Sequence, residues 1–455
     1  MPRDDSAALG GGGHGDALGE VNGYRLAWSG RASPWTEGAA SAPVPAADAG
    51  TARPIEIAWV QPLGLVSLAV TNFIRRILTL GAYDFWGRTE VRRRLWSAVR
   101  IEGEPLTYHG TGRELCTGFL IVFAIVMVPL LIGSFLIAGF YGGNPIAIGV
   151  FQAIAFLVIA YLTGVGVHRA QRYRLSRTAW RGIRGGLDGN AFAYGWVHLW
   201  TLLCIPATLG WIAPWRTTRL QSLIANGMHL GSLPVRFEAR SASLYGPFAV
   251  LWFTMTIGAF LGTALFGAVA AGIVEGYDPV RDAKTDAYLR TVVGGLAIAF
   301  MVAGYLLYLV LSAWYQARVI NHFASATRFG QARLSCRASA IGLAWIGVSN
   351  ALILAAGAVA AVAVMAAIAI PIALVLNQTL PAWSSVALQL APFAAIIAIA
   401  ALGILTPVTQ ARYNRYIVER MAIVGPVDLA AVAQSHGAGA DRGEGLSQAF
   451  DIDGY

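Results

Sequence analysis

Long apolar stretches without charged residues dominate the chain after its first hundred residues. Six of them are long enough to cross a bilayer, which takes about 20 helical residues, and none has Asp, Glu, Lys or Arg in its interior. They lie at approximately 115–140, 146–167, 246–274, 291–315, 341–370 and 386–410. Consecutive stretches form three pairs, so the pattern predicts an all-α polytopic membrane protein with six transmembrane helices arranged as three hairpins.

Two further apolar stretches are less suited to crossing. The first, 62–83, carries Arg75 and Arg76 at its middle. Each arginine costs about 2.5–3.5 kcal/mol at the bilayer centre, whereas each large aliphatic residue returns only ~0.3–0.6 kcal/mol. Its polar and apolar residues fall on opposite helical faces, which predicts a helix lying in the membrane interface. The second, 195–213, is short and interrupted by Pro206, which favours a re-entrant or interfacial segment over a true span.

Charge placement supports six spans. If neither doubtful stretch crosses, every arginine-rich link lies on one side of the membrane: 84–114, 168–194, 214–245, 316–340 and the tail after 411. The opposite side then holds only Arg281, Lys284 and Arg290, which nearby carboxylates offset. By the positive-inside rule this predicts that both termini are cytoplasmic. An eight-span arrangement, in which both doubtful stretches cross, is the alternative.

The composition agrees with a membrane protein. Of the 455 residues, 56% are hydrophobic and 13% are charged, against about 25% charged in soluble domains. The net charge is +9, and all but one of the 33 Lys and Arg residues are arginine. We expect residues 1–54 to form a disordered cytoplasmic tail, 55–425 a repeat-containing membrane domain, and 426–455 a flexible cytoplasmic tail.

One phrase occurs twice: TLGAYDFWGRTEVRR begins at Thr79, and TLGWIAPWRTTRLQS begins at Thr208. Each copy belongs to a wider pattern of a short arginine-bearing helix followed, 11 to 13 residues later, by a glycine. The five arginines and their glycines are Arg92 and Gly103, Arg177 and Gly189, Arg219 and Gly231, Arg318 and Gly330, and Arg412 and Gly425. Five copies on the predicted inner side indicate internal repeats.

The glycines predict tight turns. Polar and apolar residues alternate around Glu102-Gly103 and Asp188-Gly189, which predicts small cytoplasmic β-hairpins. Leu106 and Tyr108 would then share one hairpin face. The same argument places Phe192 and Tyr194 together on the face of a second hairpin.

The run LTLGAYDFWGRTEVRRRLWSAVRIEGEPLTYHGTGRELCTGF, at 78–119, resembles the YjgN-like family of bacterial inner-membrane proteins, a domain of unknown function. The shared features are the TLGxYxFW entry, the paired arginines and the YxGTGxEL continuation. The resemblance implies a multi-pass protein of the bacterial inner membrane. It supplies no catalytic residues.

The recurring arginines are the candidate ligand-binding residues. Arg92, Arg177, Arg219, Arg318 and Arg412 all recur just inside the predicted membrane boundary. A guanidinium is a planar donor fork suited to phosphate, so we predict that they bind anionic lipid headgroups or another phosphorylated ligand. The plainer alternative is that they set topology and cap helices. The lipid bilayer is the expected partner, and the chain lacks a pattern that would predict nucleic-acid binding.

Other chemistries have little support in the sequence. The cysteines Cys116, Cys204 and Cys336 have no CxxC spacing, and neither paired metal-binding histidines nor a GxSxG motif occurs, so we expect no cofactor, metal or enzymatic activity. No predicted span carries an internal carboxylate, which argues against an ion-coupled carrier. Asn350 and Gln152, the notable polar residues within spans, are expected to form helix–helix hydrogen bonds.

These observations predict a non-enzymatic inner-membrane protein that binds anionic lipid or a partner through an arginine-rich cytoplasmic face. The alternative is a transporter or channel for a small solute, because repeated membrane units and broken segments also occur in such proteins.

Overall fold

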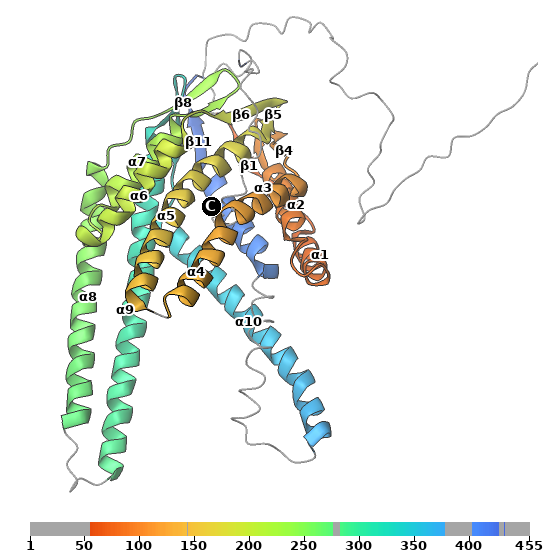
Figure 1. Ribbon diagram of the computed structural model, residues 1–455. Helices are drawn as coiled ribbons and strands as arrows, with labels where there is room; N and C mark the ends of the chain where they lie inside the picture. The colour runs from red at the N-terminus through yellow and green to blue at the C-terminus, as the bar shows by residue number, and fades with distance from the viewer. Residues whose placement is uncertain (1–54, 143, 276–282, 378–402, 427–431, 433–455) are drawn as a thin grey trace, which may run out of the picture. The chain divides into compact units, whose positions relative to one another are not determined.

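The computed structural model describes residues 55–142, 144–275, 283–377, 403–426 and 432 (Figure 1). In this part of the chain, five helices are long and apolar enough to cross a membrane. Most of the sixth predicted span, 386–410, lies outside the described residues. The predicted tails, 1–54 and 426–455, also lie outside them, apart from Pro426 and Val432.

The five long apolar helices match the first five predicted spans. Their bounds are Gly112–Val122 (α3), Phe123–Met127 (η1) and Val128–Phe140 (α4) as one continuous helix, Pro145–Ser176 (α5), Ala242–Glu275 (α8), Ala283–Ala326 (α9) and Ala340–Asn377 (α10). The π-helical segment η1 precedes Pro129, whose missing N–H interrupts the regular hydrogen-bond ladder. At most 11% of the most apolar window of any of these helices is buried within the chain, so they present their side chains to a surrounding medium.

Two shorter helix pairs contain the doubtful stretches. Helices α1 (Leu65–Leu78) and α2 (Asp84–Ser97) form the first pair, and helices α6 (Ala191–Ala207) and α7 (Ala213–Ala225) form the second. With 14 and 17 residues, α1 and α6 are about 21 and 26 Å long, which is less than the hydrocarbon core of about 30 Å.

The strands join into a sheet that the sequence did not predict. The eight-stranded sheet has the order β11-β10-β9-β8-β7-β6-β5-β4, and β1, β2 and β3 form a second sheet. The strands are β1 Ile57–Trp59, β2 Val99–Ile101, β3 Glu104–Pro105, β4 Thr107–Tyr108, β5 Thr178–Trp180, β6 Ile183–Leu187, β7 Met228–Leu230, β8 Leu233–Phe237, β9 Thr327–Phe329, β10 Ala332–Cys336 and β11 Met421–Val424. All neighbouring strands are antiparallel, so the hairpins predicted one by one pair with each other edge to edge.

Strand pairing also fixes where the helical segments begin and end. The pair α1–α2 leaves from β1 and returns to β2, and these two strands are hydrogen-bonded partners. The pair α6–α7 leaves from β6 and returns to β7, again partners. A single crossing would place the paired strands on opposite sides of the membrane. The strand pairing is therefore compatible with the interfacial and re-entrant predictions for 62–83 and 195–213, which stay predictions.

The two sheets meet at both ends. Ile55 forms a bridge with Ile423 of β11. At the other end only Leu106 separates β3 from β4, and its N–H donates to the Val99 carbonyl at 3.0 Å. Strand pairing thus runs in a closed circuit, which brings the first and last repeats of the sequence next to each other.

One predicted hairpin turn is confirmed and the other is wrong. Glu102 and Gly103 connect β2 to β3 with φ of +52° and +77°. The second hairpin instead turns at Arg181-Gly182, and Asp188-Gly189 follows β6. Phe192 and Tyr194 consequently lie in α6 and not on a hairpin face. The physical reason is the Asn190 side chain, which accepts the N–H groups of the first turn and starts a helix there.

Candidate functional site: an arginine-lined pocket

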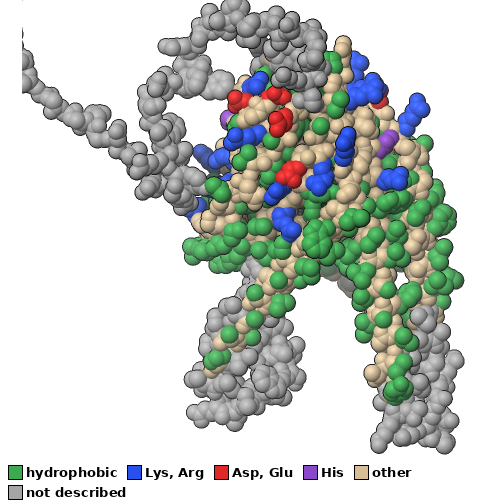
Figure 2. Space-filling view, turned by 180° about the vertical axis from the view of Figure 1, so that it is seen from behind, with side chains coloured by type: hydrophobic (Ala, Val, Ile, Leu, Met, Phe, Trp, Pro, Cys, Tyr) green, Lys and Arg blue, Asp and Glu red, His purple; other side chains and the backbone are tan. Residues whose placement is uncertain are grey.

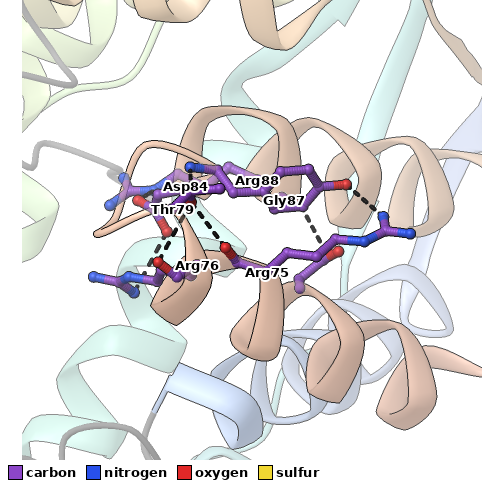
Figure 3. A network of polar contacts seen from close by, with 8 residues as sticks. Arg75, Arg76, Thr79, Asp84, Gly87 and Arg88 are labelled. Carbon is purple, nitrogen blue, oxygen red and sulfur yellow. Dashed lines mark hydrogen bonds and ion pairs between the residues drawn. The ribbon is translucent and has the colours of Figure 1, made fainter.

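The Thr-Leu-Gly phrase makes the same turn at 79–81 and 208–210. In the first copy, Thr79 Oγ1 donates to the Arg75 carbonyl at 2.8 Å and accepts the Tyr83 N–H at 2.9 Å (Figure 3). The threonine of the second copy makes both corresponding bonds. The leucines have φ of +50° and +48°, and the glycines follow at +93° and +82°. The glycine N–H then bonds the carbonyl five residues back, which ends the helix and reverses the chain.

Each turn carries a leucine at its tip. Leu80 is 98% exposed and Leu209 is 74% exposed. On α1, and at Leu63 just before it, further apolar side chains are exposed: Leu63, Val66, Ile74, Ile77 and Leu78. Leaving this much apolar surface unburied is unfavourable in water, so the helix pairs present surfaces suited to lipid.

A cavity of about 510 Å³ lies beside the first turn. Helices α1 and α2 form one wall, and the C-terminal end of α5 contributes Arg174. The other wall is the helix at 403–418, which contributes Gly403, Thr406, Pro407, Gln410 and Asn414. The cavity therefore lies where the first and last repeats meet, and we call it the seam pocket.

The seam pocket is strongly cationic. Among the described residues, its lining includes Arg76, Arg88, Arg92 and Arg174 and one carboxylate, Asp84. That carboxylate already pairs with two of the arginines, at 3.4 Å to Arg76 and 2.8 Å to Arg88 (Figure 3). The lining thus gathers four guanidinium groups from three helices, and guanidinium groups are donors suited to an anion.

Tyr83 adds a neutral hydroxyl to the lining. Burial, together with a hydrogen bond to Glu90, raises the pKa of Tyr83, so the phenol stays protonated at neutral pH. Its hydroxyl donates to Glu90 at 2.9 Å and accepts from Arg75 at 2.7 Å. This network fixes the start of α2 against the end of α1.

Small residues let α1 and α2 approach each other closely beside the pocket. Ala69 and Gly87 both line it, one from each helix of the pair. The Asn72 amide nitrogen donates to the Gly87 carbonyl at 3.3 Å, and a Cβ at Gly87 would lie 3.4 Å from Asn72. The two helices therefore approach closely at this level.

The structure brings only one of the five sequence-predicted arginines, Arg92, into the seam pocket. Arg177 is instead engaged with Glu114, whose Oε1 lies 2.7 Å from its Nη2. Arg219 is exposed on α7, and Arg318 is exposed with its guanidinium 5.1 Å from the Trp314 ring centroid.

Arg412 has a structural role. Its guanidinium donates to Asn350 Oδ1 at 3.0 Å and to Ser349 Oγ at 2.9 Å. The Asn350 side chain in turn donates to the Thr409 carbonyl at 3.3 Å. The predicted helix–helix hydrogen bond of Asn350 is therefore present, between α10 and the helix at 403–418.

Sequence reasoning missed Arg76, Arg88 and Arg174 as members of one site. They lie on α1, α2 and α5, and their convergence depends on how these helices pack. The available signal was the arginine density after the first Thr-Leu-Gly turn, where the second copy is less basic. Across the described ranges, the His, Cys, Asp and Glu residues form no group of three that could hold a metal ion.

Sequence comparison identifies the family. A family model described as a bacterial protein of unknown function (DUF898) matches residues 64–449. The chain belongs to this family. It is also 31% identical, over 142 residues, to the inner membrane protein YjgN of Salmonella typhimurium. That match covers 31% of this chain and 32% of the relative, so it spans about a third of each. No solved structure matches the chain.

The comparison confirms the resemblance found at 78–119. Membership of the family and the five apolar helices together make this chain a membrane protein with several transmembrane helices. The family description supplies no activity.

Proposed function

We propose that this chain is an inner-membrane protein that binds the phosphate of an anionic phospholipid in the seam pocket. The observation that carries the proposal is the lining of four arginines and one carboxylate. Arginine binds phosphate through two parallel N–H donors, and each hydrogen bond to a charged group contributes about 1.5–3 kcal/mol. Two or three such contacts contribute about 3–9 kcal/mol before the cost of association, so burial of the acyl chains has to supply the rest of the affinity.

A lipid suits the surroundings of the pocket better than a free anion. The apolar residues Ile77, Leu78 and Leu80 are exposed close in sequence to the pocket residue Arg76. An acyl chain would cover such a surface while the phosphate reaches the arginines. The chemistry recognised is the phosphate itself, so the experiment must separate a lipid headgroup from a free phosphate.

The proposed topology follows from the same chemistry. Six spans in three hairpins would place the sheet, the seam pocket and both termini in the cytoplasm, with the two short helix pairs dipping into the inner leaflet. The face shown in Figure 2 supports this, because Arg and Lys side chains gather on its upper part and hydrophobic side chains below. Cationic side chains are favoured next to the anionic inner leaflet and are costly within hydrocarbon.

A solute transporter is a weaker proposal. No residue of α8, α9 or α10 lines the seam pocket, although these are three of the five long apolar helices. A transport site is expected between spans near the midplane. Binding at the membrane surface therefore agrees better with the position of the arginines.

Lipid retention tests the function. The protein is purified in mild detergent and analysed by native mass spectrometry, then titrated with vesicles of phosphatidylcholine with or without 20% phosphatidylglycerol (roughly the anionic content that attracts basic surfaces). We expect retained anionic lipid and binding only to anionic vesicles, unaffected by millimolar inorganic phosphate. Competition by phosphate would point to a soluble ligand, and the absence of both would refute the proposal.

Topology has its own test. A cysteine replacing Arg181, in the β5–β6 turn, is expected to be shielded from an impermeant maleimide in intact cells. A cysteine replacing Lys284, at the start of α9, is expected to be labelled by the same maleimide in intact cells. The reverse pattern would place the arginine-rich sheet in the periplasm.

A further inference from the structure

The two Thr-Leu-Gly helix pairs can be compared residue by residue. Thr79 and Thr208 occupy equivalent positions, and the same offset relates Thr89 to Thr218. These last two are both buried, and each hydroxyl donates to the carbonyl four residues earlier, at 2.9 and 2.8 Å. The offset therefore holds for the fold as well as for the sequence.

At this offset the small residues of the seam pocket correspond to large ones. Gly87 corresponds to Arg216, and Ala69 corresponds to His198. In the second pair the Arg216 Nη2 lies 3.3 Å from the His198 Nδ1. A Cβ at Gly164 of α5 would lie 2.6 Å from the His198 Cβ, which shows how closely α5 packs there. The second pair thus has two large side chains in contact at the positions where the first pair has the pocket-lining Ala69 and Gly87.

The charges differ in the same way. In the second pair, uncharged side chains replace the arginines that line the seam pocket: Arg76, Arg88 and Arg92 correspond to Ile205, Thr217 and Gln221. The second pair thus has one guanidinium inside and lacks the cationic lining, whereas the first pair has the cationic lining around an open space.

We propose that Gly87 is the specificity-determining position that makes the α1–α2 pair the phosphate-binding copy, and that Arg216 closes the equivalent space in the α6–α7 pair. This rests on the proposed function, because it assumes that the seam pocket binds lipid phosphate. It adds that one lipid binds per chain. It also adds that both conditions, open space and arginine lining, are needed together.

The test exchanges the two residues. G87R places an arginine where the second pair has one, and we expect binding of vesicles with phosphatidylglycerol to fall at least tenfold. R216G opens the second space without supplying an arginine lining, so we expect the affinity and the single retained lipid to stay unchanged. A second retained lipid in R216G would contradict the requirement for the lining.

A second variant protects the test against misfolding of G87R. Gly403 lines the opposite wall, and among the described residues a Cβ added there comes within 4 Å of Arg76 Nη1 alone, at 3.9 Å. G403L therefore adds side-chain volume on the pocket side of this wall and is also expected to lose at least tenfold in binding. If the unsubstituted protein binds no anionic lipid, the proposed function fails. If the unsubstituted protein binds and G403L loses binding while folded G87R binds equally well, only this inference fails. If folded G403L also binds equally well, the seam pocket is not the binding site and the proposed function fails with it.

Discussion

Substitutions of Arg92 and Arg219 compare two arginines of the same repeat pattern, one inside the seam pocket and one outside it. Arg92 lines the seam pocket from α2. Arg219 lies on α7, where its side chain is exposed and outside that lining. Both follow a Thr-Leu-Gly turn on the predicted cytoplasmic side. Replacing each with glutamine removes one positive charge and keeps a side chain of similar length.

The expected magnitudes follow from these positions. A pocket guanidinium that contacts phosphate contributes about 1.5–3 kcal/mol, which corresponds to a roughly 10- to 150-fold weaker affinity in R92Q. An exposed charge outside the site acts only through the screened field, worth about 1 kcal/mol or less near an anionic membrane. R219Q is therefore expected to change the affinity by less than about fivefold.

Vesicle titration measures this difference directly. The two variants and the unsubstituted protein are titrated with vesicles containing phosphatidylglycerol at low and at physiological salt. We expect R92Q to remain weakened at both, while any R219Q effect disappears as salt rises. Equal losses in both variants would refute a localised site and favour a diffuse arginine-rich surface.

Four further outcomes are expected. G81A should lower the free energy of unfolding by about 1–2 kcal/mol, because alanine is strained at φ of +93°, whereas G139A within α4 should not destabilise; melting in detergent compares them. L80C carrying a polarity-sensitive fluorophore should show blue-shifted emission in vesicles, and water-like emission would contradict insertion of the turn. R177Q should cost about 1–2 kcal/mol of stability through its ion pair with α3, yet leave lipid retention unchanged; a loss of lipid would return Arg177 to the binding site. Burial raises the pKa of Cys336, so maleimide should modify it more slowly at pH 8 than a cysteine in the exposed β2–β3 turn, with the rate still rising above pH 9; equal rates would contradict its burial.

The arginine-to-glycine spacing aligned the repeats incorrectly at the second hairpin. The spacing from Arg177 to Gly189 matched that from Arg219 to Gly231, yet the turn of the second hairpin is at Gly182. With 52 glycines in the chain, a glycine at a chosen spacing is a weak marker of a turn. The strand start is a better reference: Arg169, Arg219, Arg318 and Arg412 all lie nine residues before the first residue of the following strand. The first repeat has Glu90 at that position.

The sheet could not be predicted because its strands are only two to five residues long. Short strands carry little periodic signal, and their partners lie in other repeats. The pairing of β4 with β5 joins residues separated by α3, α4 and α5, for example Thr107 with Ala179. Such contacts depend on the return of each helical hairpin to the place where it began.

The sequence by itself determined which segments are long and apolar enough to enter a membrane. Hydrocarbon excludes guanidinium groups and accepts apolar side chains, and this free energy is read from composition along the chain without reference to distant residues. The repeated Thr-Leu-Gly phrase likewise fixed a turn, because its hydrogen bonds are all made within five residues. Only the tertiary structure decided which arginines form a site. Arg76, Arg92 and Arg174 converge because strand pairing closes into a circuit and brings the first repeat against the last, and no local pattern in the chain specifies that closure.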